Sequence, residues 1–234
     1  MAHIAVLGLG NWGTAIARLW LLEGHKVKGW TIEQEVYESI TMSEVNEKYL
    51  PHHPVPGLDA TMHLAEAIEG SEIIVLAVPS SVILDVMEDV LPHLQPGHVL
   101  LDLAKGLAPG KRLISEAIHT RLKEEGKTNP LAVLTGPTIA PEAAGGVMTT
   151  ALVASEDQAI AQRLAQTLST PSFILHPASD PVGAELWGAY KNVVALACGL
   201  VDGLKHVGDL GGDNLKAAIF MSGFKEGCLL LAEL

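Results

Sequence analysis

Cysteine is scarce in this 234-residue sequence, and the positions of its cysteines argue against both disulfide bonds and a cysteine-ligated metal site. Cys198 and Cys228 are the two cysteines, and both lie in apolar, helix-like stretches without the spacing of a disulfide framework or a metal site. The ten histidines also lack a recurring ligand spacing, so the sequence predicts no metal site. We expect a protein of a reducing compartment.

Basic residues and long apolar runs are scarce as well. Lysine and arginine number 15 against 27 aspartates and glutamates, which gives a formal net charge of −12. A nucleic-acid-binding protein normally carries a basic patch, and this sequence shows none. No apolar run is long enough to span a membrane, and the start "MAHIAVLGLG" lacks the basic residues and cleavage site of a secretory signal. We therefore expect a cytoplasmic protein with no nucleic-acid or membrane partner.

The sequence is rich instead in short apolar segments that alternate with helical ones. Apolar residues make up 48% of it, enough for a sizeable core. Strands are predicted at residues 3–7, 26–30, 72–78, 98–104, 131–135, 149–155 and 173–176. Because strands alternating with helices are typical of βαβ units, the sequence predicts an α/β fold with a Rossmann-type, mostly parallel sheet.

The alternation stops near residue 180, where we place a domain boundary. We expect residues 1–180 to form a dinucleotide-binding domain and residues 181–234 to begin an all-helical domain. The last residues, "CLLLAEL", are almost all apolar and carry no helix stop signal. We expect the helical domain to be incomplete in this chain. The alternative is a final helix that docks on its own domain or on the partner of a homodimer.

Three glycines, Gly8, Gly10 and Gly13, lie between the first strand and the first helix. In the dinucleotide-binding fingerprint the first glycine permits a tight turn, the second lets a pyrophosphate approach the backbone, and the third allows close packing of helix on strand. The phosphate then binds the free N–H groups at the helix start. The sequence therefore predicts a dinucleotide site here, and a purely structural turn is the alternative.

Further polar residues follow the predicted strands at their carboxyl ends, where α/β sheets bind ligands. Lys105 comes directly after the strand at 98–104, in "DLAKGL". It could contact an anion or hydroxyl beside the cofactor, or it could simply be solvated. Gly136 and Thr138 follow the strand at 131–135, in "LTGPTIAPE". They could hold a polar substrate, or they could only mark the start of a helix.

Lys191 and Asn192 lie in an otherwise apolar helix, "ELWGAYKNVVALACG". A lysine among alanine, valine and leucine is costly unless its ammonium group reaches water or has a chemical role. Burial and a second cation nearby, such as Lys105, would both lower its pKa toward the range useful for proton transfer. The sequence alone does not establish that the two lysines meet.

Taken together, these motifs resemble one enzyme family. The stretches "GLGNWGTAIA", "NEKYLP", "AVPS", "AKGL", "GPTIAPE", "ELWGAYKNVVALACGLVDG" and "GDNLKAAI" occur in the order and spacing of the NAD(P)-dependent glycerol-3-phosphate dehydrogenases. The resemblance runs essentially from end to end of the chain. It implies an oxidoreductase of glycerophospholipid synthesis that interconverts sn-glycerol 3-phosphate and dihydroxyacetone phosphate by hydride transfer with NAD or NADP.

The resemblance also implies roles for single residues. Asn11 and Trp12 would line the cofactor pyrophosphate, beside the three glycines. Ala140 would lie near the nicotinamide, and Lys105 would contact both the cofactor and the substrate.

On the substrate side, Gly136 and Thr138 would hold the phosphorylated substrate, and Asn192 would assist them. Lys191 would accept the proton of the 2-hydroxyl group of glycerol 3-phosphate while the 2-hydrogen leaves as hydride. In the reverse direction Lys191 would protonate the oxygen of dihydroxyacetone phosphate.

One departure from the family limits what the resemblance implies. Family members continue beyond the point where this sequence stops, and that part carries an aspartate that assists the lysine and an Arg–Asn pair that binds the substrate phosphate. We therefore expect this chain alone to be weakly active or inactive. The alternatives are a related β-hydroxyacid or ketopantoate-type reductase and a non-catalytic dinucleotide-binding module.

Glu33 bears on the choice between the two cofactors. It lies about 20 residues past the glycines, where an acidic side chain accepts hydrogen bonds from the ribose 2′-hydroxyl and repels a 2′-phosphate. Many members of the family have a basic residue near this point, whereas here the preceding residues are Thr31 and Ile32. We expect NAD(H) to bind better than NADP(H). The alternative is that Glu33 only stabilises the start of the next helix.

Overall fold

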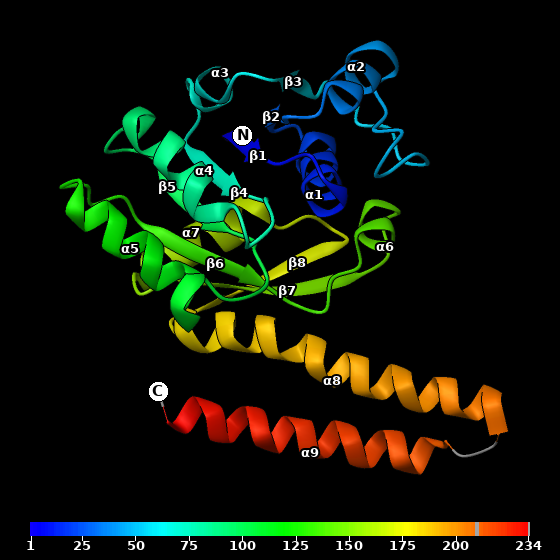
Figure 1. Ribbon diagram of the computed structural model, residues 1–234. Helices are drawn as coiled ribbons and strands as arrows, with labels where there is room; N and C mark the ends of the chain where they lie inside the picture. Colours follow the sequence, from blue (N-terminus) through cyan, green and yellow to red (C-terminus); the bar gives the residue numbers. More distant parts are fainter. Residues whose placement is uncertain (209–210, 234) are drawn as a thin grey trace.

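One mixed sheet of eight strands runs through the computed structural model, which describes residues 1–208 and 211–233 apart from the side chain of Lys111 (Figure 1). The strands are β1 (His3–Leu7), β2 (Lys26–Trp30), β3 (Asp59–Thr61), β4 (Ile73–Leu76), β5 (Val99–Asp102), β6 (Leu131–Thr135), β7 (Thr149–Ala154) and β8 (Phe173–Ala178). Their order is β3-β2-β1-β4-β5-β6-β7-β8, and neighbours are parallel except β6 and β7. The predicted α/β, mostly parallel fold is confirmed.

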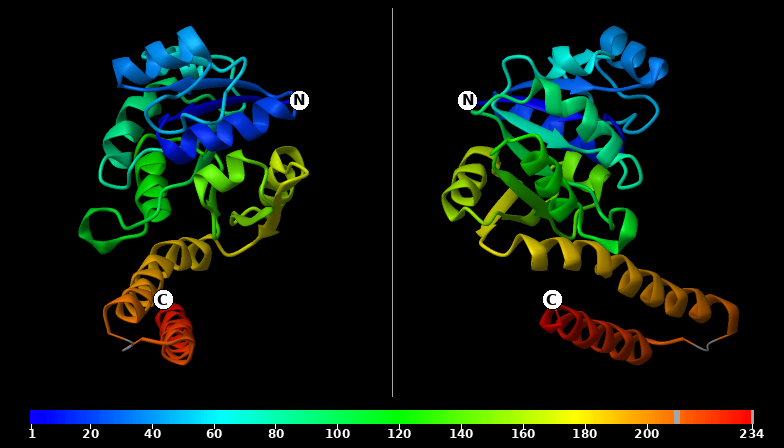
Figure 2. Two further views of the ribbon diagram at one scale, coloured as in Figure 1. Left: turned by 90° about the vertical axis from the view of Figure 1, so that its right-hand side faces the viewer. Right: turned by 60° about the vertical axis from the view of Figure 1, so that its left-hand side comes forward.

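Seven short helices connect these strands. They are α1 (Asn11–Leu22), α2 (Gln34–Ser43), α3 (Leu64–Ile68), α4 (Ile83–Val90), α5 (Ile114–Glu124), α6 (Ala140–Ala144) and α7 (Gln158–Leu168), together with 3-10 turns at Leu91–His93 and Pro109–Lys111. The helices cover both faces of the sheet, as in doubly wound α/β folds (Figure 2).

Two hydrophobic cores lie on the two faces of the sheet. In β1, Ile4 and Val6 pack into the core beneath α1, α2 and α7, whereas Ala5 and Leu7 pack into the core beneath α3, α4 and α5. Successive strand residues point to opposite faces, so every residue of β4, β5 and β6 is buried. This is why these strands appear in the sequence as unbroken apolar runs.

Strand positions were predicted well except at the edge of the sheet. The seven predicted strands all occur, and most boundaries agree within two residues of the observed ones. The strand β3 was not predicted; it has three residues and is only partly buried. A strand of this length shows no hydrophobic alternation that a sequence reading could detect.

Two long helices follow the sheet, α8 (Pro181–Gly208) and α9 (Asp213–Ala232), and they pack side by side as a hairpin (Figures 1 and 2). The first turns of α8 pack on β6, where Ala184, Glu185 and Gly188 are buried. In the same turns of α8, Trp187 stacks on Phe224 of α9 with ring centroids 5.4 Å apart. The first turns of α8 therefore lie at the carboxyl edge of the sheet.

No helix in the described part of the chain is both long and apolar enough to cross a membrane. The same residues contain no group of three or more histidine, cysteine, aspartate or glutamate side chains arranged to hold a metal ion.

Candidate active site

The glycine loop after β1 has the shape that a bound dinucleotide requires. Gly8 has φ +107°, and a Cβ atom there would lie 2.8 Å from the Ala77 carbonyl oxygen. A Cβ atom on Gly13 would lie 1.9 Å from the Gly8 carbonyl oxygen, whereas one on Gly10 would have no neighbour within 4 Å. Packing within the chain thus requires the first and third glycines. The second borders open space, where a pyrophosphate can approach the backbone.

The start of α1 adds free hydrogen-bond donors to this loop. Gly10 is the N-cap residue and supplies no side-chain cap, and the Thr14 N–H donates to the Gly10 carbonyl at 3.0 Å. The preceding N–H groups of the first turn have no acceptor within the helix, and the helix dipole is positive at this end. Asn11 is exposed and Trp12 half-buried beside them. The loop and the helix start together fit a dinucleotide pyrophosphate.

Lys105 connects the glycine loop with the loop that follows β6. It is half-buried just after β5, and its Nζ lies 6.0 Å from the centroid of the Trp12 ring. Lys105 Nζ also donates to the Thr138 hydroxyl at 3.3 Å. Burial lowers the pKa of Lys105. The first turn of α1 and the loops after β5 and β6 are thus brought to one point at the carboxyl edge of the sheet.

Lys191 reaches the same edge from α8. Its ammonium group donates a hydrogen bond to the Gly136 carbonyl, directly after β6. Burial, and then the charge of the neighbouring Lys105, lower the pKa of Lys191 to about 8. Lys105 and Lys191 thus both contact the segment of residues 136–138, a proximity that the sequence alone left open. An amine that titrates near neutrality can both accept and donate a proton.

A buried carboxyl group lies beneath Lys105. Asp102, the last residue of β5, is fully buried, and its Oδ1 accepts from the Ala104 N–H at 2.8 Å. Among the described residues, Asp102 Oδ2 and the Thr135 hydroxyl have no hydrogen-bond partner. Burial is the main cause that raises the pKa of Asp102 to about 8. The carboxyl group is therefore largely protonated at neutral pH, and it shapes the turn that leads to Lys105.

Glu185 fixes α8 against the sheet domain. Its side chain is buried and accepts hydrogen bonds from the Ser115 hydroxyl and from the Ser115 N–H, the latter at 3.2 Å. It also accepts from the N–H of Ile114 at the start of α5. A carboxylate from one helix thus caps another, which fixes the start of the helix that carries Lys191.

The family follows from the comparison with known proteins. The family model described as "NAD-dependent glycerol-3-phosphate dehydrogenase N-terminus" matches residues 3–161, and the model of the corresponding C-terminus matches residues 180–234. The chain belongs to the NAD-dependent glycerol-3-phosphate dehydrogenase family. The resemblance inferred from the motifs is confirmed.

Curated relatives and a solved structure agree with this assignment. Proteins named glycerol-3-phosphate dehydrogenase [NAD(P)+] are 39% identical in Rhodospirillum rubrum, over 96% of this chain and 62% of the relative, and 35% identical in Fusobacterium nucleatum, over 97% and 66%. The crystal structure of the Coxiella burnetii glycerol-3-phosphate dehydrogenase matches with a TM-score of 0.88 at 33% identity, over 99% of this chain and 69% of that one. The chain thus spans slightly less than two thirds of the length of these curated relatives.

Within this member of the dehydrogenase family, two further predicted site residues, Ala140 and Asn192, have different surroundings. Ala140 begins α6, is buried, and packs in a small cluster with Trp12, so it borders the cofactor loop. Asn192 is exposed on α8, about 100° around the helix from Lys191. The structure therefore brings Ala140 to the site and leaves Asn192 outside it.

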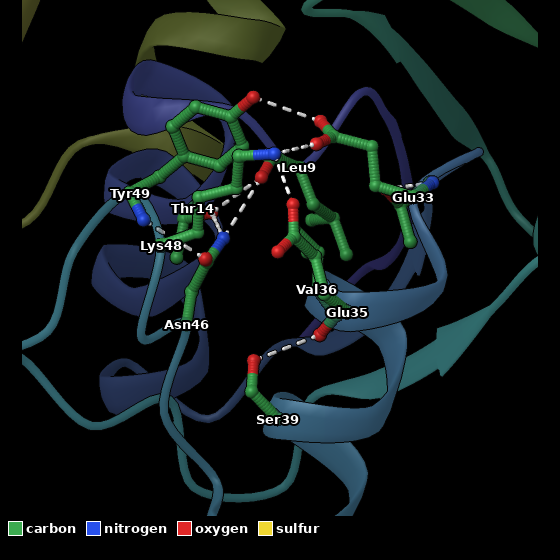
Figure 3. Close-up of polar contacts among 10 residues, drawn as sticks. Leu9, Thr14, Glu33, Glu35, Val36, Ser39, Asn46, Lys48 and Tyr49 are labelled. Atoms are coloured by element: carbon green, nitrogen blue, oxygen red, sulfur yellow. Dashed lines mark hydrogen bonds and ion pairs between the residues drawn. The ribbon is translucent and has the colours of Figure 1, made fainter.

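Glu33 lies between β2 and α2, and its carboxylate faces Lys48 and Tyr49 (Figure 3). Its carboxylate accepts from Lys48 Nζ at 2.5 Å and from the Tyr49 hydroxyl at 2.8 Å. Glu33 is the N-cap residue of α2, yet its side chain makes no capping hydrogen bond. Glu33 thus does not cap α2 through its side chain, and the alternative that its charge stabilises the start of this helix stays open. Lys48 and Tyr49 belong to the quoted motif "NEKYLP", for which the sequence analysis gave no role.

A cavity of about 660 Å³ lies between α5, β6 and the start of α8. Its lining includes Leu107, Arg112, Glu116 and Leu186, and it shares no residue with the glycine loop or with the Lys105–Lys191 pair. Volume alone would point elsewhere, to an apolar groove of about 760 Å³ along α8, lined by residues between Ala195 and Val207. The lowered lysine pKa values and the glycine loop point instead to the carboxyl edge of the sheet, and we place the site there.

Proposed function

We propose that the chain is an oxidoreductase that interconverts sn-glycerol 3-phosphate and dihydroxyacetone phosphate with NAD(H) or NADP(H), in the supply of glycerol 3-phosphate for glycerophospholipid synthesis. The observation that carries the proposal is the pair Lys105 and Lys191 beside the glycine loop, with the pKa of Lys191 lowered to about 8. One amine near neutrality and a second cation suit a substrate that exchanges a proton and carries a phosphate.

Residues 1–180 would bind the dinucleotide. The backbone at Gly8, Gly10 and Gly13 and the first turn of α1 would hold its pyrophosphate. Trp12 and Ala140, which pack in one cluster, would line the path toward the nicotinamide. The nicotinamide, when bound, supplies the hydride acceptor or donor.

Lys191 would accept and donate the proton of the substrate 2-hydroxyl group. In oxidation, its neutral amine accepts the proton of the 2-hydroxyl group, while the hydrogen on the same carbon leaves with its electron pair as hydride. In reduction, the ammonium form returns a proton to the carbonyl oxygen as hydride arrives at the carbon. The Gly136 carbonyl holds the Lys191 nitrogen in place, since it accepts one of its hydrogens.

Lys105 and Thr138 would position the substrate. The Lys105 ammonium already lies within hydrogen-bond distance of the Thr138 hydroxyl, so both polar groups can contact one small ligand. The positive charge of Lys105 would attract the anionic substrate and would also keep the pKa of Lys191 low.

The remaining parts of the proposal concern the context of the reaction. Residues 181–234 would form part of the helical domain that completes the substrate site, with Asn192 near its edge. We propose a cytoplasmic enzyme and, from the apolar side chains exposed on α8 and α9, a homodimer.

Titration with NADH followed by a panel of keto substrates tests the proposal. We expect saturable NADH binding, and oxidation of NADH that depends on dihydroxyacetone phosphate. Turnover of a keto acid but not of dihydroxyacetone phosphate would instead indicate a β-hydroxyacid or ketopantoate-type reductase. Binding of NADH with no turnover on any substrate would indicate a dinucleotide-binding module.

A further inference from the structure

We infer that Lys48 is a residue that determines cofactor specificity, because it neutralises Glu33 and so lets the adenosine end of the site accept a 2′-phosphate as well as a 2′-hydroxyl group. The inference rests on the proposed function, since it assumes a nicotinamide dinucleotide on the glycine loop.

The place of Glu33 makes it the residue that the adenosine ribose would meet. The Gly8 N–H donates to the Trp30 carbonyl at 3.0 Å, which ties the glycine loop to the end of β2. The Glu33 N–H donates to the Thr31 hydroxyl at 3.2 Å, so the backbone turns there toward α2. In this fold an acidic side chain at this point binds the ribose 2′-hydroxyl.

Lys48 changes the charge that the adenosine ribose would meet at Glu33. Its Nζ contacts Glu33 Oε2 at 2.5 Å and also pairs with Glu35 (Figure 3). The Lys48 contact, and then the Tyr49 hydroxyl, lower the pKa of Glu33, and the two carboxylates raise the pKa of Lys48. Glu33 and Lys48 are therefore charged at neutral pH, and two glutamates with one lysine give the cluster a formal charge of −1. Without Lys48 the charge facing the ribose would be −2.

The segment that carries Lys48 is fixed to the glycine loop. Asn46 is fully buried, and its Nδ2 donates to the Leu9 carbonyl and to the Thr14 hydroxyl, both at 2.8 Å. Asn46 Oδ1 accepts from the Tyr49 N–H at 3.1 Å. Lys48 thus holds its place relative to the loop that binds the pyrophosphate, while 40% of its side chain stays exposed to a ligand.

The hydrogen-bond capacity of the cluster allows either cofactor. Each Glu33 oxygen already accepts one hydrogen bond and keeps a lone pair for a ribose hydroxyl group. An ammonium group has three donors, and Lys48 uses two on Glu33 and Glu35, which leaves one for a phosphate oxygen. A 2′-phosphate carries up to two negative charges, so its binding depends on this one cation far more than the binding of a hydroxyl group does.

The ion pairs themselves contribute little to folding, because exposed pairs are solvated and screened. Lys48→Gln should therefore fold normally, and a change in cofactor preference would not reflect loss of structure. Thermal unfolding of each variant checks this point.

The test is to measure the dissociation constants of NADH and NADPH by fluorescence titration, on the unmodified chain and on Lys48→Gln, Lys48→Arg and Glu35→Gln. We expect Lys48→Gln to weaken NADPH binding by about 5- to 20-fold and NADH binding by less than about 2-fold, from the loss of one charge-assisted contact. Lys48→Arg should restore NADPH binding. Glu35→Gln, which removes a competing carboxylate, should strengthen it.

Salt dependence supplies a second readout. NADPH affinity of the unmodified chain should fall with salt more steeply than that of Lys48→Gln, since one ionic contact is missing from the variant. Equal changes for both cofactors, or no change in either, would overturn the inference, and so would NADH binding without measurable NADPH binding in the unmodified chain. If neither cofactor binds the unmodified chain, the proposed function fails instead.

Discussion

The ammonium group of Lys191, on the helix that leaves the sheet domain, donates a hydrogen bond to the carbonyl of Gly136 at the end of β6. A backbone carbonyl can only accept, so it holds the nitrogen without competing for a proton. Once deprotonated, the amine can keep this hydrogen bond and still present a lone pair. The geometry therefore suits a group that takes up and releases one proton in a fixed position.

Lys191→Ala should abolish turnover and leave cofactor binding nearly unchanged. General acid–base groups typically contribute about 10²- to 10⁴-fold to the rate, and the glycine loop does not contact this side chain. Steady-state kinetics with an NADH titration measure both effects. Lys205→Ala is the matched control, because Lys205 lies on the same helix but pairs with Asp213. Near-normal turnover in Lys191→Ala would show that the assigned proton transfer is wrong.

The two reaction directions should depend on pH in opposite ways. With the pKa of Lys191 lowered to about 8, the neutral amine accumulates as pH rises through this value. The rate of glycerol 3-phosphate oxidation should therefore rise there, and the rate of dihydroxyacetone phosphate reduction should fall. Profiles of kcat in both directions measure this. Two profiles that move the same way would contradict the role of Lys191.

Lys105→Gln should move that inflection to higher pH. The charge of Lys105 is one of the causes that lower the pKa of Lys191, so its removal lets the pKa rise toward the ordinary lysine value. The pH profile of kcat in the variant is the measurement. An unchanged inflection would mean that the two side chains do not interact in solution.

Asp102→Asn should stabilise the fold at alkaline pH. The pKa of Asp102 is raised to about 8 in the folded chain, so the protonated carboxyl group favours folding most below the ordinary aspartate pKa. That contribution is lost as pH rises through about 8. The amide cannot ionise, so the midpoint of thermal unfolding should exceed that of the unmodified chain near pH 9 and approach it near pH 4. A midpoint difference that is constant with pH would argue that Asp102 does not titrate in this range.

Glu33→Arg should narrow or reverse the preference between the cofactors. We expect the unmodified chain to bind NADH more tightly than NADPH, because Glu33 can accept from a ribose hydroxyl group and repels a phosphate. Competition binding on the chain measures the ratio, and Glu38→Gln, an exposed acidic residue of the same helix, is the control. Tighter binding of NADPH than of NADH by the unmodified chain would contradict this role for Glu33.

Much of the fold was predictable because it depends on local patterns. The apolar runs mark strands that are buried on both faces, and the three glycines mark the turn after β1. The change of pattern near residue 180 precedes α8, which begins at Pro181. Lys105 and Lys191 were identified from their surroundings, a polar position after a strand and a charge in an apolar helix.

The residues that were not predicted from the sequence make contacts between segments that are far apart along the chain. The full burial of Asp102 was not predicted, since it lies between β4 and β6, where β5 pairs with both. Glu185 lies in an ordinary helical sequence, and its hydrogen bonds form only because α5 packs against α8. Lys48 meets Glu33 only because Asn46 holds its segment to the glycine loop. Which of these residues come into contact depends on how the segments pack together, and no short sequence motif specifies that packing.

The most direct test of the account is a single-turnover experiment with NADH that carries deuterium at the transferable position, mixed with dihydroxyacetone phosphate and a stoichiometric amount of the chain. The account predicts glycerol 3-phosphate that carries deuterium on carbon 2, formed by the unmodified chain and not by Lys191→Ala. Tight NADH binding without any labelled glycerol 3-phosphate, or equal labelling by the two proteins, would contradict it.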